Sequence, residues 1–573
     1  MKSIAQLLAS LFTLSSLHGI SSLDTPIVHI TLGSVAGRRL HLEHGDVDAF
    51  LGIPYATPPI GQLRFRKPLP VKPWNDVLNA TTKTTACWQT DFTPLRNVSL
   101  VYPVATEDCL HINVWRPSHI CDEGVSCCGR NLSVVVFVYG GAFQWGDAGL
   151  FIYDPANFVA LSNVVYVTFN HRLGIMGFYP SSAESLPGNV GFYDQLSALR
   201  WVKDNIASFG GNPGDVTLVG HSAGAMSVGL HCTSAMSRGL FKRAILQSGT
   251  PITLIIGVAF SGSVLFREHA EKLGCYASEA ETRKKIPEIL QCLRQLDAKK
   301  IYSTIGSKSI QSQLFVPDSG DDFLPTNILS VENWKKIHVD EMLIGTTSEE
   351  GALFIDIIRN AAPDLDSVLT EDYRRGVALA LYLVFEIPVD KANVIVEHYF
   401  GAPEVQHEQE SVIKILGTLL ADVLFNCPAH FFASTAAKEG VATYVYKFDH
   451  RPSYSMWPKH YGPTHVEELP FTFGTLPFFS DESRLTSPPL TEETKQFLKS
   501  IRFTPEEQSL MLQTVGVWSS FIKKGKMLLP GSNETWPKYS AEHPEYVTMK
   551  PNCFKRTKLS EPCHLFKPFL VKE

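Results

Sequence analysis

The chain has 573 residues, of which 44% are hydrophobic and 19% are charged, a composition typical of a globular protein rather than a disordered, collagen-like or low-complexity one. The formal net charge is -6, so no basic excess exists to neutralise a phosphate backbone, and we expect no nucleic-acid partner. The length would fit several average domains, but large α/β enzymes reach it as one unit.

The first 22 residues have the pattern of a secretory signal peptide. Lys2 precedes a short, mostly apolar run, Ile4–Leu14, and small residues follow, with cleavage expected between Gly19 and Ser22. The run is too short to span a membrane, although an amphipathic first helix would give a similar pattern. No later stretch reaches about 18 uninterrupted apolar residues, and the C-terminus carries no retention or lipid-anchor signal. We therefore expect a secreted, extracellular protein without a membrane anchor.

Glycosylation sequons and cysteines fit the same compartment. We expect N-linked glycans at the four N-x-S/T sequons, which are Asn79, Asn97, Asn131 and Asn533. The chain has 11 cysteines, an odd number, so most should pair in an oxidising compartment while at least one stays free. A zinc site at the adjacent Cys127 and Cys128 is not expected, because no spaced His or Cys partners accompany them. No metal or cofactor is predicted elsewhere.

Apolar segments of strand length recur along the chain and alternate with helical stretches. Most of these segments do not alternate with polar residues, which is typical of strands buried on both faces of a parallel sheet. The predicted strands are Val134–Tyr139, Val164–Asn170, Val216–Val219, Lys242–Gln247, Glu341–Ile344 and Thr443–Phe448. The predicted helices include Asp194–Phe209, Gly224–Cys232 and Glu268–Leu273. This alternation predicts an α/β fold with a mostly parallel sheet flanked by helices, as a single domain over residues 23–573.

One G-x-S-x-G pattern, at residues 220–224, lies where a nucleophilic serine is expected. A predicted strand ends just before Ser222 and a predicted helix follows it, so the serine would lie on a sharp turn that exposes its hydroxyl. Glycines on either side would let neighbouring backbone approach closely. An ordinary glycine-rich turn is the alternative, and the strand-to-helix context favours the nucleophile.

A nucleophilic serine also needs backbone N–H groups about 3 Å from the oxyanion that forms during the reaction. The segment at residues 139–143 follows a buried strand, and it offers Gly141 and Ala142 as donors. Ala223, at the start of the helix after Ser222, is the third candidate. A glycine pair in a hairpin or bulge is the alternative reading of the first segment.

An ordered set of short motifs resembles the type-B carboxylesterase and cholinesterase family over nearly the whole chain. The motifs are L-G-I-P-Y at 51–55, L-R-F-R-K-P at 63–68, E-D-C-L at 107–110, N-V-W at 113–115, Y-G-G at 139–141, N-H-R-L-G at 170–174, G-N-V-G at 188–191, F-G-G-N-P at 209–213 and L-Q-S-G at 246–249. No single motif is specific, whereas their order is. The resemblance implies an α/β-hydrolase fold and a serine hydrolase that acts on small-molecule carboxylic esters without a cofactor.

The resemblance also implies the other two members of a catalytic triad. The family places its acid in a Glu–Gly pair after a strand, which implies Glu350 here, with the adjacent Glu349 as the alternative. The base lies in a G-x-x-H-x-x-E-x-x-x-x-F-G pattern, which fits residues 462–474 and implies His465. The chain order of serine, acid and histidine is that of α/β hydrolases. His465 would take the Ser222 proton, and Glu350 would orient the ring while an acyl-enzyme forms.

Structural features of the family are implied at further positions. The implied disulfides are Cys87–Cys109, Cys275–Cys292 and Cys427–Cys563, which leaves Cys121, Cys127, Cys128, Cys232 and Cys553 unassigned. The implied ion pairs are Arg64–Glu107 and Arg172–Asp194. Ser248 resembles a family hydroxyl near the acid, and a turn serine at a strand end is the alternative.

The sequence departs from the family at positions that bear on the substrate. His221 precedes the nucleophile where many members have Glu, and Ala142 stands where a third glycine is common. Cholinesterases carry a choline-binding tryptophan deep in the loop that corresponds to Cys87–Cys109, whereas here Trp88 directly follows the first cysteine and no other tryptophan occurs within that loop. Residues 311–313, Q-S-Q, are polar where cholinesterases tend to be aromatic. Because a quaternary ammonium group needs an aromatic wall, the sequence favours a general carboxylesterase over a cholinesterase.

Three other functions share this sequence pattern. A cholinesterase or a lipase would use the same chemistry with a different pocket. A non-catalytic adhesion protein of the neuroligin type would be expected to lack a triad member and to carry a membrane anchor. This chain keeps all three predicted triad residues, which favours an enzyme.

Overall fold

The computed structural model describes residues 25–571 except 83–84, 90–91, 96–97, 101–104, 121–130, 180–187, 255–261, 277–285, 305–314, 328–329, 331–333, 362–371 and 482–489. The predicted signal peptide, the sequon at Asn97 and the polar stretch at residues 311–313 lie outside the described residues. The same holds for three of the cysteines that the resemblance left unassigned, Cys121, Cys127 and Cys128.

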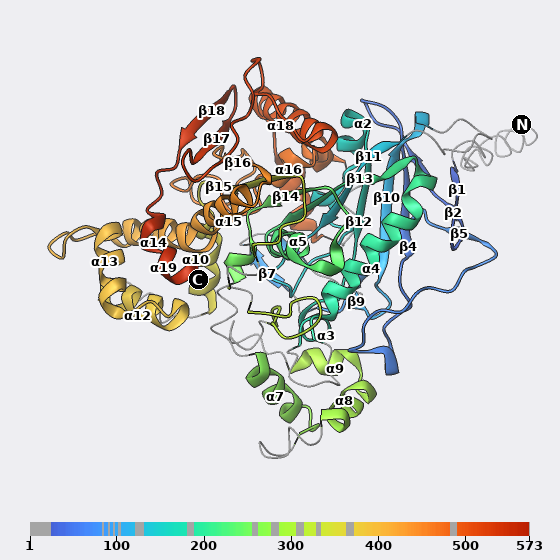
Figure 1. Ribbon diagram of the computed structural model, residues 1–573, viewed down its shortest axis with the longest axis horizontal. Coiled ribbons are helices and arrows are strands. Elements are labelled where there is room, and N and C mark those ends of the chain that lie inside the picture. The colour runs from blue at the N-terminus through green and yellow to red at the C-terminus, as the bar shows by residue number, and fades with distance from the viewer. Residues whose placement is uncertain are drawn as a thin grey trace, which may run out of the picture.

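A large sheet forms the centre of the described part of the chain (Figure 1). Its 11 strands are, in spatial order, β18 (Cys553–Lys558), β17 (Glu545–Lys550), β16 (Ala442–Phe448), β15 (Glu341–Thr347), β14 (Arg243–Gln247), β13 (Gly211–His221), β11 (Leu132–Val138), β12 (Val165–Phe169), β10 (His111–Pro117), β4 (Val47–Pro54) and β3 (Arg38–Leu40). The strands from β17 to β12 run parallel, and those at the two edges are antiparallel. The predicted α/β fold with a mostly parallel central sheet is confirmed.

The central strands are buried on both faces because successive side chains of a strand point to opposite sides of the sheet. In β11, Val134, Val136 and Val138 belong to one buried cluster, whereas Val135 and Phe137 belong to a second cluster on the opposite face. A strand with polar residues at every second position would place polar side chains in one of these two buried clusters, which explains the unbroken apolar runs in the sequence.

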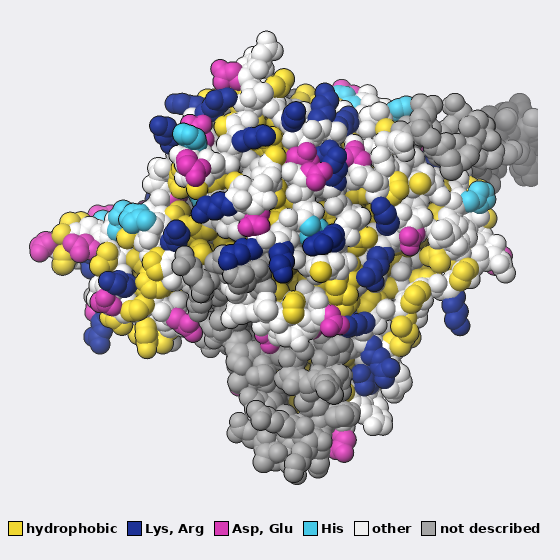
Figure 2. Space-filling view, viewed as in Figure 1, with side chains coloured by type: hydrophobic (Ala, Val, Ile, Leu, Met, Phe, Trp, Pro, Cys, Tyr) yellow, Lys and Arg dark blue, Asp and Glu magenta, His cyan; other side chains and the backbone are white. Residues whose placement is uncertain are grey.

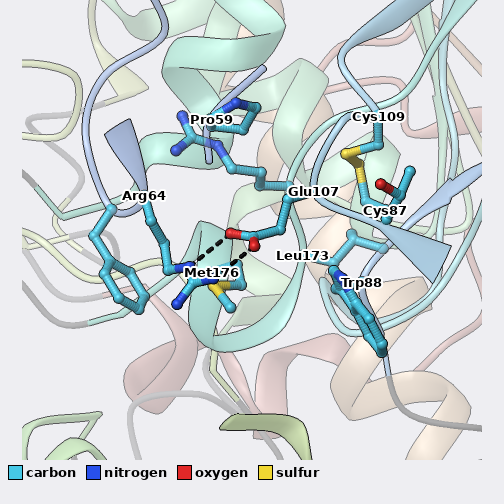
Figure 3. Close-up of a pocket in the computed structure, with 11 residues that line it drawn as sticks. Pro59, Arg64, Cys87, Trp88, Glu107, Cys109, Leu173 and Met176 are labelled. Carbon is cyan, nitrogen blue, oxygen red and sulfur yellow. Dashed lines mark hydrogen bonds and ion pairs between the residues drawn. A yellow bond between two sulfur atoms is a disulfide. The ribbon is translucent and has the colours of Figure 1, made fainter. Parts of the chain in front are cut away.

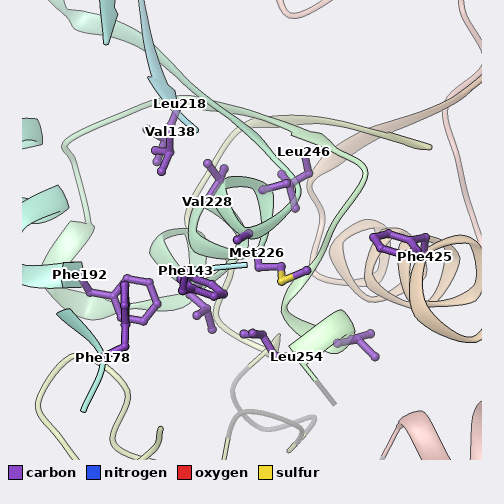
Figure 4. Packing of buried hydrophobic residues seen from close by; sticks show 14 of the residues in the cluster. Val138, Phe143, Phe178, Phe192, Leu218, Met226, Val228, Leu246, Leu254 and Phe425 are labelled. Atoms are coloured by element: carbon purple, nitrogen blue, oxygen red, sulfur yellow. The ribbon is translucent and has the colours of Figure 1, made fainter. Parts of the chain in front are cut away.

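Helices cover the two faces of this sheet. Helix α5 (Ala223–Thr233) packs against β11, β13 and β14. Figure 4 shows its Met226 and Val228 among Val138, Leu218 and Leu246, which come from those three strands. Helix α18 (Pro505–Lys524) lies against β11 and β13 within the second buried cluster. The predicted helix at 194–209 is helix α4 (Val190–Asn205) followed by the 3-10 turn η5 (Ile206–Phe209).

A long helical excursion separates β15 from β16. It comprises α10 (Gly351–Ala361), α12 (Tyr373–Phe385), α13 (Val389–Phe400), α14 (Gln409–Ala421), the π-helical segment η11 (Asp422–Asn426) and α15 (Cys427–Lys438). The continuous stretch Gln409–Lys438 has the length and apolar composition of a membrane span, but 72% of its most apolar window is buried inside the protein. Helices α12 and α13 lie at one end of the molecule (Figure 1), and Figure 2 shows hydrophobic side chains over α12, where Leu379, Tyr382 and Leu383 are exposed.

Shorter elements complete the described chain. A three-stranded sheet is formed by β1 (Ile27–Ile30), β2 (Gly33–Ala36) and β5 (Val77–Asn79). The remaining strands are the pairs β6 (Ala86–Cys87) with β9 (Ala105–Thr106) and β7 (Phe92–Leu95) with β8 (Val98–Leu100). The other α-helices are α2 (Ala156–Ser162), α3 (Gly174–Gly177), α7 (Gly262–Lys272), α8 (Ile286–Gln295), α9 (Ala298–Ser303), α16 (Leu469–Thr472), α17 (Glu492–Ser500) and α19 (Lys567–Leu570).

Disulfides and ion pairs tie the loops to the sheet. The structure contains the bonds Cys87–Cys109, Cys275–Cys292 and Cys427–Cys563, and it leaves Cys232 buried and free and Cys553 exposed and free. The two implied ion pairs are also present: Arg64 donates to both oxygens of Glu107 at 2.6 Å, and Arg172 donates to Asp194 at 2.7 and 2.8 Å. Figure 3 shows the Arg64–Glu107 pair near the Cys87–Cys109 bond. These bonds fit an oxidising compartment.

Candidate active site

Ser222 lies on the turn between β13 and α5, at the carboxyl end of the central parallel strands. Its φ of 55° and ψ of -125° are unusual for a residue other than glycine, and such strain is typical of functional sites. Its N–H donates to the carbonyl of Gln247 at the end of the neighbouring strand β14, at 2.8 Å. This bond holds the turn so that the serine lies at the edge of the sheet, only 9% exposed.

Close backbone packing explains the glycines around the serine. A Cβ on Gly224 would lie 2.0 Å from the carbonyl oxygen of Val138, and a Cβ on Gly220 would lie 2.3 Å from the carbonyl oxygen of Gly224. A Cβ on Gly140 would lie 2.8 Å from the Cβ of Ser222, so this glycine lets the loop after β11 approach the serine. The G-x-S-x-G spacing is therefore a steric requirement of this turn.

His465 and Glu350 are in direct contact, although 115 residues separate them in the sequence. His465 Nδ1 is 2.5 Å from Glu350 Oε2, and the other carboxyl oxygen accepts the Thr347 N–H at 2.7 Å. Glu350 follows β15 at the carboxyl edge of the sheet and is fully buried. The rings of Phe354 and Phe425 lie 5.4 and 5.2 Å from the His465 ring, which is only 3% exposed. Low local polarity strengthens the histidine–carboxylate interaction.

Glu349, the alternative acid, is directed elsewhere. Its N–H donates to Pro463 at 3.1 Å, and its side chain packs against Gly462. Burial raises its pKa, and the charges that act on it are those of Lys414, Asp449, Lys447 and Asp422 rather than the histidine. Glu349 forms an isolated β-bridge with Thr464 in the turn after β15, and of the two glutamates only Glu350 contacts the His465 ring.

The loop after β11 has an unusual backbone conformation at the two predicted oxyanion-binding residues. Gly141 and Ala142 have φ values of 123° and 53°. The Gly141 carbonyl is turned away, since it accepts the N–H groups of Gln144 and Trp145 at 2.9 and 3.0 Å. The Ala142 carbonyl accepts the Gln144 side-chain amide at 3.1 Å. Within the described residues, the N–H groups of Gly141 and Ala142 donate to no protein acceptor and are free to bind a ligand oxygen.

Comparison with known proteins identifies the family of the chain. The sequence model of the carboxylesterase family matches residues 24–566. The chain belongs to the carboxylesterase family. It is a carboxylic ester hydrolase of the α/β-hydrolase fold, acting on small-molecule esters.

Curated relatives of this carboxylesterase cover most of its length. It is 34% identical over 563 residues to an acetylcholinesterase of Bungarus fasciatus, spanning 94% of this chain and 86% of that protein. It is 32% identical over 546 residues to acetylcholinesterase-1 of Trittame loki, spanning 92% and 91%. It is 29% identical over 592 residues to an acetylcholinesterase of Leptinotarsa decemlineata, spanning 96% and 86%.

A second buried pair lies beside His465 in this carboxylesterase. The ring of His221 is 4.8 Å from the ring of His465, and His221 Nε2 is 3.4 Å from Glu468 Oε1. Burial and the nearby Glu350 raise the pKa of Glu468 well above its ordinary value, and burial and His465 lower the pKa of His221. The sequence singled out both residues, but it gave no sign that they meet, because 247 positions separate them. Ser248 has a φ of 54°, and its hydroxyl lies near the Glu468 carboxyl without a hydrogen bond of normal geometry.

The aromatic groups near the Cys87–Cys109 loop are engaged with each other. The Trp88 ring is stacked on Tyr302 at 6.0 Å, with an angle of 22° between the ring planes. Figure 3 shows Trp88 at one side of a small pocket whose other side is the Arg64–Glu107 pair. One face of the indole is therefore covered by another ring. Within the described ranges, the carboxylesterase has no cluster of three His, Cys, Asp or Glu residues that could hold a metal ion.

Proposed function

We propose that this carboxylesterase is a secreted serine esterase in which Ser222 is the nucleophile, His465 the base and Glu350 the acid. The observation that carries the proposal is the buried 2.5 Å contact between His465 and Glu350 at the same sheet edge as the Ser222 turn. The contact fixes the imidazole with its Nε2 available to take a proton from a hydroxyl. An isolated buried histidine would have neither this orientation nor the adjacent negative charge.

The reaction proceeds in two stages. His465 takes the Ser222 proton while the hydroxyl oxygen attacks the ester carbonyl, and Glu350 stabilises the imidazolium that forms. The developing oxyanion is bound by the N–H groups of Gly141, Ala142 and Ala223. The imidazolium then returns its proton to the leaving alcohol, and water hydrolyses the acyl-enzyme by the same route.

Secretion and glycosylation are part of the proposal. The three disulfides support passage through an oxidising compartment. Three of the four sequons lie within the described residues, and the side chains of Asn79, Asn131 and Asn533 are exposed there. Deglycosylation of secreted protein, followed by mass spectrometry at the four asparagines, tests both points.

We propose uncharged esters as the substrates, and a cholinesterase is the second candidate. The names of the three relatives favour the cholinesterase. Against it, Trp88 is already stacked on Tyr302, and His221 occupies the position before the nucleophile where an anion would favour a cationic substrate. Binding of a quaternary ammonium group depends on open aromatic faces within about 6 Å.

Covalent labelling tests the nucleophile. An organophosphate should modify Ser222 in the wild-type protein, and Ser222→Ala should give a folded protein that is neither labelled nor active. Adduct formation at another residue, or hydrolysis by Ser222→Ala within about tenfold of wild type, would remove the assignment.

The substrate class is tested with acetylcholine and its uncharged carbon isostere, 3,3-dimethylbutyl acetate. The two esters have nearly the same shape, so the ratio of their kcat/KM values reports the charge preference of the site. We expect the neutral ester to be the better substrate. A ratio about tenfold in favour of acetylcholine would establish the cholinesterase instead.

A further inference from the structure

His221 and Glu468 form a buried polar pair that the esterase mechanism does not use. His221 Nε2 and Glu468 Oε1 are 3.4 Å apart, and each side chain is about 1% exposed. Within the described part of the chain, His221 Nε2 and both Glu468 oxygens make no hydrogen bond of ordinary geometry. Leaving a buried polar group unpaired is costly, and two such groups that face each other are satisfied together when one proton lies between them.

The surroundings of the pair oppose a net charge on it. Burial has the largest effect on Glu468, and the carboxylates of Glu350 and Glu467 add to it, so that the ionised form is disfavoured. Its own backbone N–H and the Ser248 hydroxyl act in the opposite direction, each by less than burial, and the pKa remains well above its ordinary value. His221 is affected by burial and by His465, which disfavour its cationic form. The other ionisable groups that face Glu468 are the phenols of Tyr153, Tyr446 and Tyr454. Those phenols are buried, and their raised pKa values keep them neutral.

We propose that His221 and Glu468 hold one proton between them, so that the pair has no net charge and makes the leaving-group side of the site selective for uncharged alcohols. The net charge is zero whether the shared proton is on the carboxyl group or on the imidazole. The inference rests on the proposed function, because the leaving alcohol takes its proton from His465 and departs beside the ring that contacts His221.

The selectivity follows from electrostatics at short range. A permanent cation gains free energy from a buried negative charge a few ångströms away, and a pair without net charge offers none. A carboxylate at position 221 would change this. Two carboxyl groups at this distance share one proton and keep one negative charge, so His221→Glu lowers the net charge of the pair by one.

The test compares acetylcholine with 3,3-dimethylbutyl acetate in three proteins. In His221→Glu, the ratio of kcat/KM for the charged ester to kcat/KM for the neutral ester should rise about tenfold or more. In Glu468→Gln, a neutral amide replaces a carboxyl group that shares its proton, so the ratio should stay within about twofold of wild type. A loss of packing alone would change both esters together and leave the ratio unmoved.

Two results would overturn the inference. An unchanged ratio in His221→Glu would show that the charge of the pair does not reach the leaving group. A tenfold fall of the ratio in Glu468→Gln would show that Glu468 is an anion in the wild type. The measurement on Glu468→Gln tests the inference even if His221→Glu does not fold.

Titration of each variant with an organophosphate counts folded active sites. Absence of labelling at Ser222 in the wild type would contradict the proposed function. Normal labelling together with an unchanged ratio in His221→Glu, or with a tenfold fall of the ratio in Glu468→Gln, would contradict only the role of the His221–Glu468 pair.

Discussion

Glu350 and Glu468 are both fully buried near His465, and they differ in what surrounds their oxygens. Glu350 has the Thr347 N–H on one oxygen at 2.7 Å and the His465 ring on the other at 2.5 Å. Within the described residues, neither oxygen of Glu468 has a hydrogen bond of ordinary geometry. The Nε2 atom of His221 lies 3.4 Å from Glu468 Oε1. Burial raises the pKa of Glu468 well above its usual range.

The difference shows that two buried carboxyl groups in one small region can differ in the hydrogen-bond donors that face them. A buried carboxylate stays ionised only where donors replace the water it has lost, and without them it keeps its proton. The negative charge of Glu350 adds to this effect, since it raises the pKa of Glu468 further. We expect the two residues to respond differently to the same isosteric change, from Glu to Gln.

The largest effect is expected at Glu350. Glu350→Gln keeps the shape but removes the charge that stabilises the imidazolium, so kcat should fall by about 10³- to 10⁴-fold. Glu349→Gln is the matched control at the adjacent position, and its kcat should stay within about tenfold of wild type. Steady-state kinetics of both variants with a neutral ester checks the pair. A larger fall of kcat in Glu349→Gln than in Glu350→Gln would show that Glu349 is the acid. The contrast between Glu350 and Glu468 would then no longer describe the catalytic acid.

A smaller effect, on stability, is expected where a buried carboxylate does have a cation. Asp194 accepts hydrogen bonds from Arg172 at 2.7 and 2.8 Å, and both side chains are buried. Asp194→Asn leaves the Arg172 charge buried without its partner and should lower the free energy of unfolding by about 3–5 kcal/mol. The exposed pair Lys67–Asp322, with side-chain exposures of 42% and 79%, is the control, and Asp322→Asn should cost under about 1 kcal/mol. Denaturant unfolding measures both free energies. Equal losses in Asp194→Asn and Asp322→Asn would contradict the expected difference between the buried and the exposed ion pair.

The sequence predicts the parts of this arrangement that depend on local chemistry. The six apolar runs become strands because Val, Ile and Phe side chains suit both faces of a parallel sheet. Their ends are less predictable, since pairing decides them: β13 begins at Gly211, well before the predicted start at Val216, because Gly211 pairs with Leu132 of β11. The nucleophile turn is predictable because close backbone contacts demand its glycines.

The sequence does not predict the parts that depend on distant contacts. The choice of Glu350 over Glu349 needed the family pattern, since composition and spacing treat adjacent glutamates alike. In the sequence, His221 is only a departure from the family, and Glu468 is only one position of the pattern around His465. Their approach to 3.4 Å follows from the path of the chain after β16, which brings residues 464–468 back to the sheet edge. No local pattern carries that information.

The smallest expected effect is a change in how stability depends on pH, and it measures the charge of Glu468 directly. A carboxyl group whose folded pKa is raised binds more protons in the folded protein than in the unfolded chain. Its contribution to stability is therefore complete below the unfolded pKa, about 4.3, and is lost as pH rises through the folded pKa. Each such group lowers the free energy of unfolding by up to about 1.4 kcal/mol per pH unit in that interval.

Glu468→Gln should remove its share of this slope, so that the variant gains stability relative to wild type as pH rises above about 4.3. Glu467 is the matched control: burial raises its pKa to about 7, so the gain of Glu467→Gln should level off near that pH. His221 acts in the opposite sense, since its lowered pKa costs stability as pH falls below about 6.5. Thermal unfolding at several pH values checks all three. If Glu468→Gln keeps the wild-type slope, Glu468 is ionised in the folded protein and does not differ from Glu350 in charge.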